Sequence, residues 1–550
     1  MGVDLIDVAV SGAPPLSRRT GLLALPVFEE DLTPRPAGGG LLAELDRRLG
    51  GHLAAAARAE RFKARAGEQL LLPTLGRVPA ERVLLLGLGP RGEAARWLEG
   101  AEPLRAAAGK AARAARHGTL AMALPEADLQ PLGTPSPEAL AGLARACVEG
   151  ALLGAYRFDR YRERKGREPG LRGVTVLVPA PAARARPVTE AVSLGRAVAE
   201  ATAWARDLVN LGPSECTPRR LAAAARALAR QARLRCTVRG PRQISALRMG
   251  LFQAVARGSA EPAALVSLSW APRGTGRRAR PLVLVGKAVT FDSGGLSLKP
   301  TDSMTTMHTD MAGAAAVVAA MRVVATLRPP FPVHAVFGAC ENMPGGRAYK
   351  PSDVVTAHGG QTVEITNTDA EGRLVLGDVL SWAAQTWKPA ALVDLATLTG
   401  ACMVALGHTT AGVFGPDGPV VEAVLAAARR AGEDAWRLPL TESCAENLKS
   451  ERADLKNSGD RMGSAIAAAH FLKRFTRDAP WAHVDIAGPS HAGREKGHLS
   501  SGGTGYGVRT LVELVRAWRA EPLARTARRR RPAAADSARR ARGGRRGGRR

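Results

Sequence analysis

The chain is poor in cysteine and in aromatic side chains. Six cysteines are scattered over 550 residues with no Cys-x-x-Cys pair, and aromatic residues make up only 4% of the chain. A disulfide framework and a thiolate zinc site are therefore not indicated. We expect reduced cysteines, as in a cytosolic protein.

Signals that direct a protein to a membrane are also missing. Residues 1–10 include Asp4 and Asp7 and lack the basic and apolar regions of a signal peptide. Ile6 stands where a myristoylation pattern needs serine or threonine, and no run of about 18 apolar residues indicates a membrane span. We expect a soluble, cytoplasmic protein with no membrane partner.

Acidic residues are outnumbered, so the formal net charge is +28. Residues 525–550 contain twelve arginines and one aspartate and supply +11 of this charge. This tail has little to bury and is expected to be disordered. One hypothesis is that the tail binds nucleic acid weakly and electrostatically, without base stacking because it contains no aromatic residue. The other is that the tail is a solvated extension whose arginines reflect the codon bias of the genome.

The length predicts at least two domains. In the first part, residues 3–10, 82–89 and 173–178 are typical of strands, and residues 140–156 of a helix. Gly87, Gly89 and Gly92 spell G-x-G-x-x-G, but no acidic residue follows at the ribose position, which favours a glycine turn over a dinucleotide site. A proline-rich linker at 179–187 places a domain boundary near residue 185.

In the second part, strand patterns alternate with helix patterns. Strands are predicted at 281–285, 333–337, 391–395 and 482–486, and helices at 188–208, 313–327 and 372–387. This alternation predicts an α/β fold with a mostly parallel sheet, helices on both faces and ligands at the strand C-termini. We expect a first domain at 1–185, a catalytic domain at 186–520 and a tail at 521–550.

Acidic and basic side chains gather at the predicted strand ends of this second domain. The potential metal ligands are Lys287, Asp292, Asp310, Asp369 and Glu371. Carboxylates that bridge suit two ions, and magnesium, manganese and zinc are all allowed; a lysine ligand must first lose its proton. Thr368 or Asp369 is expected to cap the following helix.

The cluster predicts metal-assisted hydrolysis. Lys299 is a candidate for stabilising an oxyanion, and Arg373 for holding an anion near the attacking water. The alternatives are ordinary surface salt bridges, a dinuclear phosphatase, or a scaffold that has lost activity. Lys287 would be an odd ligand beside phosphate, and no ligand position is lost. His334 and His483 lie in strand patterns and are expected to be hydrogen-bonded core residues.

Three motifs resemble the leucyl aminopeptidases, or cytosol aminopeptidases, of peptidase family M17. They are VGKAVTFDSGGLSLKP (285–300), MHTDMAGAAAV (307–317) and NTDAEGRL (367–374). Further motifs, among them NMPGGRAYKPSDVV (342–355) and PWAHVDIAG (480–488), extend the resemblance over roughly 205–515. The first domain matches more weakly, chiefly through EGALLGAYRFDRY (149–161). The family implies a macro-domain-like N-terminal α/β domain, a larger α/β/α catalytic domain and a homohexamer that acts on peptides.

The resemblance also implies a role for each site residue. Asp292 and Glu371 would bridge two divalent ions, manganese or zinc, with Lys287 and Asp310 completing one site and Asp369 the other. Lys299 and Arg373 would be the catalytic pair, with a bicarbonate on Arg373 as general base. The expected substrate contacts are Met307, Thr397, Leu398 and Ala487.

A few positions depart from the family pattern. His308 replaces a common lysine or arginine, and Gly377 a common alanine. Ser490 and His491 stand where an apolar or aromatic residue is frequent. We therefore expect a side-chain preference that is broader than leucine or shifted away from it.

Overall fold

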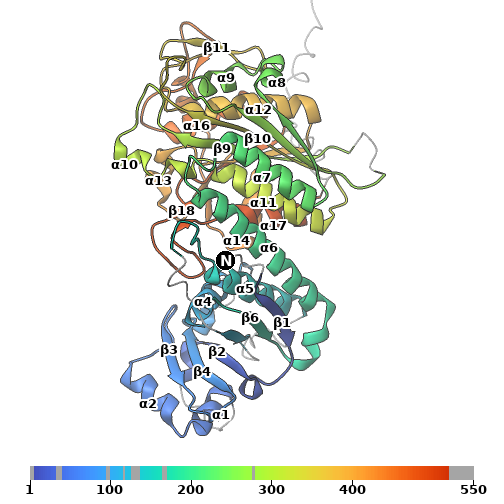
Figure 1. Ribbon diagram of the computed structural model, residues 1–550, viewed down its shortest axis with the longest axis vertical. Helices are drawn as coiled ribbons and strands as arrows, with labels where there is room; N and C mark the ends of the chain where they lie inside the picture. The colour runs from blue at the N-terminus through green and yellow to red at the C-terminus, as the bar shows by residue number, and fades with distance from the viewer. Residues whose placement is uncertain are drawn as a thin grey trace, which may run out of the picture.

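The computed structural model of the chain describes residues 5–32, 40–93, 99–115, 118–125, 137–163, 170–274 and 279–519. They form two α/β lobes stacked along the long axis of the molecule (Figure 1). The N-terminal lobe ends with β6 (Gly173–Leu177), and the C-terminal lobe runs from α7 (Pro218–Gln231) to α17 (Val508–Ala517). The predicted α/β fold is confirmed, whereas the predicted tail lies outside the described residues.

The sheet of the N-terminal lobe has the order β1-β6-β5-β2-β4-β3, and of its described pairs only β3 with β4 is antiparallel. The other strands are β1 (Asp7–Ser11), β2 (Thr20–Val27), β3 (Gln69–Pro73), β4 (Ala80–Gly87) and β5 (Thr119–Ala123). Successive residues of β2 point to opposite faces, as the pleat requires. Leu22 packs under α4 (Glu102–Ala114) and α5 (Pro137–Ala155), whereas Leu23 packs under α1 (Leu41–Arg48) and α2 (His52–Ala59).

The glycine-rich segment after β4 is a turn. Gly89 has φ +81°, and a Cβ at Gly87 would lie 2.2 Å from the carbonyl oxygen of Arg65. This close backbone packing accounts for the glycines.

A long helix, α6 (Arg186–Asn210), joins the lobes. Val188 and Val192 near its beginning pack in the core of the N-terminal lobe, and Leu208 and Val209 near its end pack in a core of the C-terminal lobe. The predicted linker is only a 3₁₀ turn, η5 (Ala180–Arg184), directly before this helix. The boundary near residue 185 stays a prediction.

Charged side chains also cross between the lobes. Glu149 of α5 accepts hydrogen bonds from Arg105 (2.9 Å) and Arg145 (2.6 Å), and Arg145 also pairs with Glu513 of α17. Glu102 at the start of α4 pairs with Arg509 of α17 at 3.2 Å. The lobes are thus connected by buried ion pairs as well as by α6.

The sheet of the C-terminal lobe has the order β15-β14-β17-β13-β9-β10-β8-β7. Its four central strands, β17, β13, β9 and β10, are mutually parallel. The antiparallel pairs are β7 with β8, β8 with β10, and β14 with β17. The bounds are β7 (Arg235–Arg239), β8 (Ala264–Trp270), β9 (Leu282–Asp292), β10 (Val333–Asn342), β13 (Ala391–Ala396), β14 (Ala411–Phe414), β15 (Ala435–Arg437) and β17 (Trp481–Asp485).

Helices cover both faces of this sheet, as predicted. One face packs against α6, α7, α11 (Ala312–Leu327), α14 (Pro419–Ala431) and α17, and the other against α9 (Gly250–Ala256), α12 (Glu371–Trp387) and α16 (Ser464–Lys473). Because both faces are covered, β9 is buried at ten of its eleven positions. By length and composition, the described segment Thr301–Leu327 could cross a membrane, but 78% of its most apolar window is buried inside the protein, the position of a core helix.

Two predicted boundaries were wrong. The strand expected to end at residue 285 continues to Asp292, so Lys287 lies within β9 and not after it. The N-cap of α12 is Ala370, which makes no side-chain capping bond, and not Thr368 or Asp369. Both differences arise from contacts with the neighbouring β10 and with the loop after β9.

Candidate metal centre

Lys287 lies in the middle of β9, between β10 and β13, and is buried. Its Nζ is 2.7 Å from Asp310 Oδ1, 3.0 Å from Glu371 Oε1, and donates to the Thr397 carbonyl at 2.9 Å. Burial alone would lower the pKa of this ammonium, but the carboxylates of Asp310, Glu371 and Asp292 raise it above its ordinary value. A strand residue thus places a positive charge at the centre of an acidic cluster.

Asp292 ends β9, and its carboxylate is held from three sides. Oδ1 accepts from the amide of Gly294 and from Nδ2 of Asn342, both at 2.8 Å, and Lys299 Nζ lies 2.9 Å from Oδ2. Asn342 ends β10 and pairs with Asp292 in the sheet register. The parallel pair β9–β10 therefore brings an amide to the carboxylate that it orients.

Asp369 and Glu371 arrive from the turn that begins α12. Thr368, just before them, does not cap the helix because its hydroxyl donates to the Gly294 carbonyl at 2.6 Å and accepts from the Ser297 amide at 2.7 Å. The Thr368 carbonyl accepts from Asn342 Nδ2 (2.9 Å) and from the Tyr349 hydroxyl (2.7 Å). These bonds attach the α12 turn to the loop after β9.

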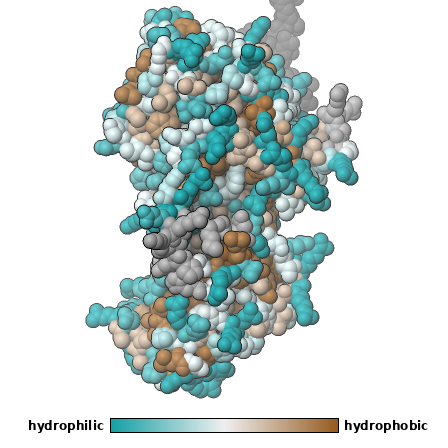
Figure 2. Space-filling model, in the orientation of Figure 1, coloured by the Kyte–Doolittle hydropathy of each residue, from teal (hydrophilic) through white to brown (hydrophobic). Residues whose placement is uncertain are grey.

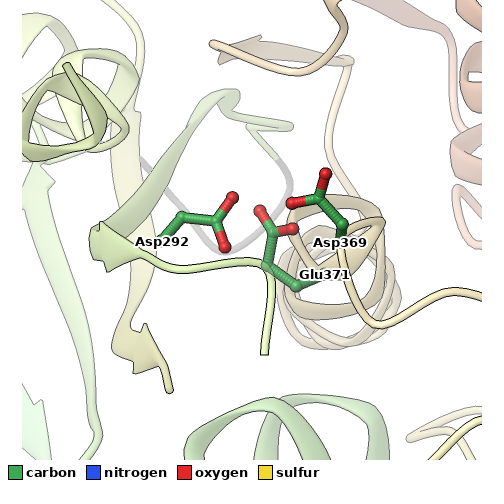
Figure 3. A group of neighbouring side chains, drawn as sticks. All are labelled: Asp292, Asp369 and Glu371. Carbon is green, nitrogen blue, oxygen red and sulfur yellow. The ribbon is translucent and has the colours of Figure 1, made fainter. Parts of the chain in front are cut away.

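The three carboxylates of Asp292, Asp369 and Glu371 point toward one another (Figure 3). Each offers an oxygen within 4.8 Å of the others. Burial and the nearby Asp292 raise the pKa of Glu371 to about 8, even though Lys287 opposes this shift. Burial also raises the pKa of Asp310, to about 6. Four carboxyl groups thus face the two ammonium groups of Lys287 and Lys299, and burial and mutual repulsion disfavour the ionised forms of Glu371 and Asp310.

The donor set fits divalent cations. Oδ2 of Asp310 is buried and has no hydrogen-bond partner among the described residues. Crowded carboxylate oxygens with raised pKa values are what a hard or borderline dication stabilises. All five predicted ligands, including Lys287, converge on this centre.

The two remaining predicted cations border the same cluster. Lys299 also pairs with Asp369. Arg373, on the first turn of α12, donates from Nη1 to the Asn457 carbonyl at 2.9 Å, while its buried Nε has no hydrogen-bond partner among the described residues. Burial lowers the pKa of Arg373 to about 10, although Glu371 and Asp485 oppose the shift. Arg373 can therefore still offer a donor to an anion.

The predicted substrate contacts lie on segments attached to the cluster. Thr397, after β13, donates from Oγ1 to Asp310 Oδ1 at 2.7 Å. Leu398 follows it, and Ala487 follows the neighbouring strand β17. Met307 begins η6 (Met307–Thr309), directly before Asp310.

The histidines that the sequence singled out lie in different environments. Burial lowers the pKa of His308 in η6 and of His491 in β18 (His491–Ala492), and His308 is near enough to lower that of His491 further. His483 is hydrogen-bonded in the core, with Nδ1 2.6 Å from Asp394 Oδ1, as predicted. The expectation for His334 was wrong at Nδ1, which has no partner among the described residues; its ring stacks on Trp387.

Three side chains that order the segments around the ligands have no recognisable signal of their own in the sequence. Asn342 and Tyr349 lie in NMPGGRAYKPSDVV, a motif whose likeness to the family was the only available signal. Asp485, in PWAHVDIAG, was equally hidden, since a single aspartate ending a strand has no ligand pattern. Their roles appear only when β9, β10, β13 and β17 are placed side by side.

Two sequence profiles match most of the chain. The profile described as "Cytosol aminopeptidase family, catalytic domain" matches residues 203–512, and the one described as "Cytosol aminopeptidase family, N-terminal domain" matches residues 24–165. A "Probable cytosol aminopeptidase" of Geobacter sp. (strain M21) is 42% identical over 514 residues, which are 92% of this chain and 99% of that protein. Its counterpart in Aquifex aeolicus (strain VF5) is 40% identical over 90% of this chain and 94% of its own.

Solved structures give the same result. A mutant of tomato leucine aminopeptidase superposes with a TM-score of 0.82 at 34% identity, covering 93% of this chain and 96% of its own. The bottromycin maturation enzyme BotP, solved in complex with Mn, has a TM-score of 0.76 at 40% identity, covering 90% of this chain and 99% of its own.

Proposed function

The chain belongs to the cytosol aminopeptidase family and is a metal-dependent aminopeptidase, and we propose that its buried cluster binds two divalent ions. The observation that carries the proposal is the convergence of Asp292, Asp369 and Glu371, whose ligand oxygens lie within 4.8 Å of one another. The substrate class is peptides with a free N-terminus, including those that begin with leucine.

The ion pairs of the cluster divide it into two groups, which supports two metal sites. Lys287 contacts Asp310 and Glu371, whereas Lys299 contacts Asp292 and Asp369. We assign Lys287 and Asp310 to one site and Asp369 to the other, with Asp292 and Glu371 bridging. Manganese or zinc suits this set, and BotP was solved with Mn.

The ions, when bound, supply a Lewis acid for the scissile carbonyl and lower the pKa of a water molecule. The chain contributes cationic side chains that orient the reacting groups and stabilise the negative charge that forms on them. Lys299 extends from the loop after β9 and is assigned to stabilise the oxyanion of the tetrahedral intermediate. Arg373, whose Nε has no hydrogen-bond partner in the described part of the chain, is assigned to hold bicarbonate as the general base.

Substrate positions follow from the segments beside the cluster. We assign Thr397 and Leu398 to the peptide backbone, and Met307 and Ala487 to the wall of the pocket for the N-terminal side chain. His308 and His491 add polar atoms near Met307, and Ser490 is buried in the same segment as Ala487. These replacements support a preference broader than leucine.

Hydrolysis of leucine-p-nitroanilide after chelation, followed by re-addition of manganese or zinc, tests the proposal. We expect activity and about two metal ions per chain to return together by elemental analysis, and Glu371→Ala to remain inactive. Glu190→Ala, on an exposed helix position of α6, is the control. Activity on p-nitrophenyl phosphate alone would instead establish a dinuclear phosphatase.

We also propose a cytoplasmic homohexamer, as the family implies. Light scattering during size-exclusion chromatography measures the native mass directly. A monomeric, fully active protein would contradict the assembly and leave the chemistry intact.

A further inference from the structure

We propose that Asp485 is a positioning residue that sets the distance between the two backbone segments which contact the substrate. This inference rests on the proposed function. Asp485 is the last residue of β17 and is fully buried. Its Oδ1 accepts from the amides of Leu398 (3.2 Å) and Ala487 (3.1 Å), and its Oδ2 accepts from the Thr399 hydroxyl (2.7 Å).

The three donors belong to two segments that leave neighbouring strands. Leu398 and Thr399 follow β13, and Ala487 follows β17; the two strands pair in parallel with Ala396 opposite Asp485. The last ladder bond runs from the Ile486 amide to the Ala396 carbonyl at 2.8 Å. Beyond it the segments would separate, and the Asp485 carboxylate replaces the missing ladder bonds.

The β13 segment is also attached to the metal ligands. Thr397 donates to Asp310, and its carbonyl accepts from Lys287 Nζ. Because Asp485 binds the next two residues, it connects Ala487 to the cluster through one short piece of backbone. A shift of this carboxylate would therefore move the pocket wall relative to the metal ligands.

The environment of Asp485 is polar but contains no direct ion pair among the described residues. Burial raises the pKa of Asp485, and the His483 imidazole and the three donors oppose that shift. His483 is in turn hydrogen-bonded to Asp394, whose other oxygen accepts from Trp481 Nε1 at 2.7 Å. Asp394, His483 and Trp481 thus form a buried polar layer whose hydrogen bonds do not include the Asp485 carboxylate.

This arrangement restricts how substrate can bind. The amides of Leu398 and Ala487 are already used by Asp485, and the Thr397 carbonyl by Lys287. Substrate must therefore meet Leu398 and Ala487 through their carbonyls and side chains. Asp485 touches no reacting atom, so its effect on the reaction is transmitted through these segments.

Paired variants of Thr399 test the inference without removing the buried charge. Thr399→Val keeps the shape of the side chain but loses the hydroxyl that donates to Asp485, and Thr399→Ser keeps the hydroxyl. We expect Thr399→Val and Asp485→Asn to lower kcat/KM for leucine-p-nitroanilide by about 10- to 100-fold, since small misplacements in a site cost this much. Thr399→Ser should retain wild-type values.

Three readouts separate positioning from general damage. The metal content should stay at the wild-type level, KM should rise, and the ratio of kcat/KM for leucine- over alanine-p-nitroanilide should fall because the pocket wall at Ala487 has moved. Asp394→Asn is the control, since it weakens the buried layer without touching either segment. It should lower Tm and leave the leucine-to-alanine ratio unchanged.

Failure of the positioning role and failure of the proposed function give different results. If Thr399→Val and Asp485→Asn keep the wild-type ratio and KM, or if Asp394→Asn changes both equally, the positioning role is overturned. If wild-type protein hydrolyses no aminoacyl substrate with any metal, the proposed function itself is wrong.

Discussion

At the scale of the residue, the metal centre depends on the absence of a side chain as much as on its charges. Gly372 lies between Glu371 and Arg373, and a Cβ there would be 2.4 Å from Cε and 2.7 Å from Nζ of Lys287. The Lys287 ammonium is held by Asp310, Glu371 and Thr397 and cannot simply swing away. The glycine of NTDAEGRL therefore leaves the room that the Lys287 side chain needs.

Gly372→Ala should weaken metal binding. The added methyl group displaces Lys287 from its carboxylates, so we expect metal affinity to fall by about 10- to 100-fold, the usual effect of disturbing groups around a metal site. Titration of the metal-free protein with manganese by calorimetry measures this. Gly377→Ala is the matched control on the same helix, because the nearest atoms to a Cβ there belong to the Phe475 ring, at 3.1 Å, and not to a metal ligand. Equal losses in both variants would indicate damage to α12 and not crowding of Lys287.

Asn342→Leu should also lower metal affinity by about 10- to 100-fold. The variant removes the amide that donates to Asp292 and to the Thr368 carbonyl. Tyr349→Phe removes only the second donor to that carbonyl, so it should cost about 1 kcal/mol of stability and leave metal affinity near wild type. The pair contradicts our account if Tyr349→Phe weakens metal binding as strongly as Asn342→Leu.

Sequence could reveal the charged residues that can bind metal but not the residues that hold the segments around them. Lys287, Asp292, Asp310, Asp369 and Glu371 have chemistry that points to metal, and the structure brings them together. An asparagine or a tyrosine that holds a carbonyl has no such pattern. Its role depends on which strands are neighbours, and strand order is not encoded by local composition.

At the scale of the element, helix and strand types were predictable and their ends were not. The apolar run before Lys287 predicted a strand at 281–285, which placed Lys287 and Asp292 after its end. Pairing with β10 continues as far as Asp292 opposite Asn342, and this tertiary contact outweighs the local pattern. Thr368 likewise has a good capping side chain, which the loop after β9 has already engaged.

Close packing of α11 on β13 leads to a prediction at this scale. A Cβ at Gly313 would lie 2.1 Å from the carbonyl oxygen of Leu395, a backbone atom that cannot rotate away. Gly313→Ala should force the helix from the sheet and destabilise the protein by about 1 to 3 kcal/mol. Gly142→Ala, in α5, meets no atom within 4 Å and should instead stabilise by about 0.5 to 1 kcal/mol. Thermal unfolding of both variants measures the difference, and a neutral Gly313→Ala would contradict the packing argument.

At the scale of the whole molecule, the contact between the lobes is charged and buried, and this makes it sensitive to acid. Burial lowers the pKa of His498 to about 4 despite Glu102, which lies 3.2 Å away. Arg509 and Arg105 face the same imidazole and oppose its protonation. Burial would raise the pKa of Glu149, but Arg145 and Arg105 lower it to about 2.

Stability should therefore fall as the pH decreases from 6.5. Below this pH the unfolded chain protonates His498 and the folded chain does not, so the folded state loses up to about 3 kcal/mol by pH 4. Glu149 adds a further loss below its ordinary pKa of 4.5. Tm measured from pH 7 to pH 4 should drop less in His498→Asn than in wild type. Parallel curves for the two proteins would remove His498 from this effect.

Positive charge is also unevenly distributed over the molecule. Besides the tail, residues 216–260 contain ten arginines and no acidic residue, and Arg219, Arg226 and Arg230 are exposed on α7, which lies on the face shown in Figure 2. The tail hypothesis needs a test that separates these two sources. We expect deletion of residues 521–550 to leave activity and Tm unchanged and to reduce salt-dependent retention on DNA. Retention that survives deletion but is lost on replacing the three arginines with glutamine would assign it to α7.

The helix α6 has a consequence for how such a protein can change over evolutionary time. Its first half is part of one core and its second half part of another, and Glu513 and Arg509 of α17 pair with residues of the opposite lobe. A recombination event that exchanged the N-terminal half of the gene would therefore have to replace matching positions near the C-terminus as well. Each lobe therefore depends on residues of the other, and we expect neither to be exchangeable on its own.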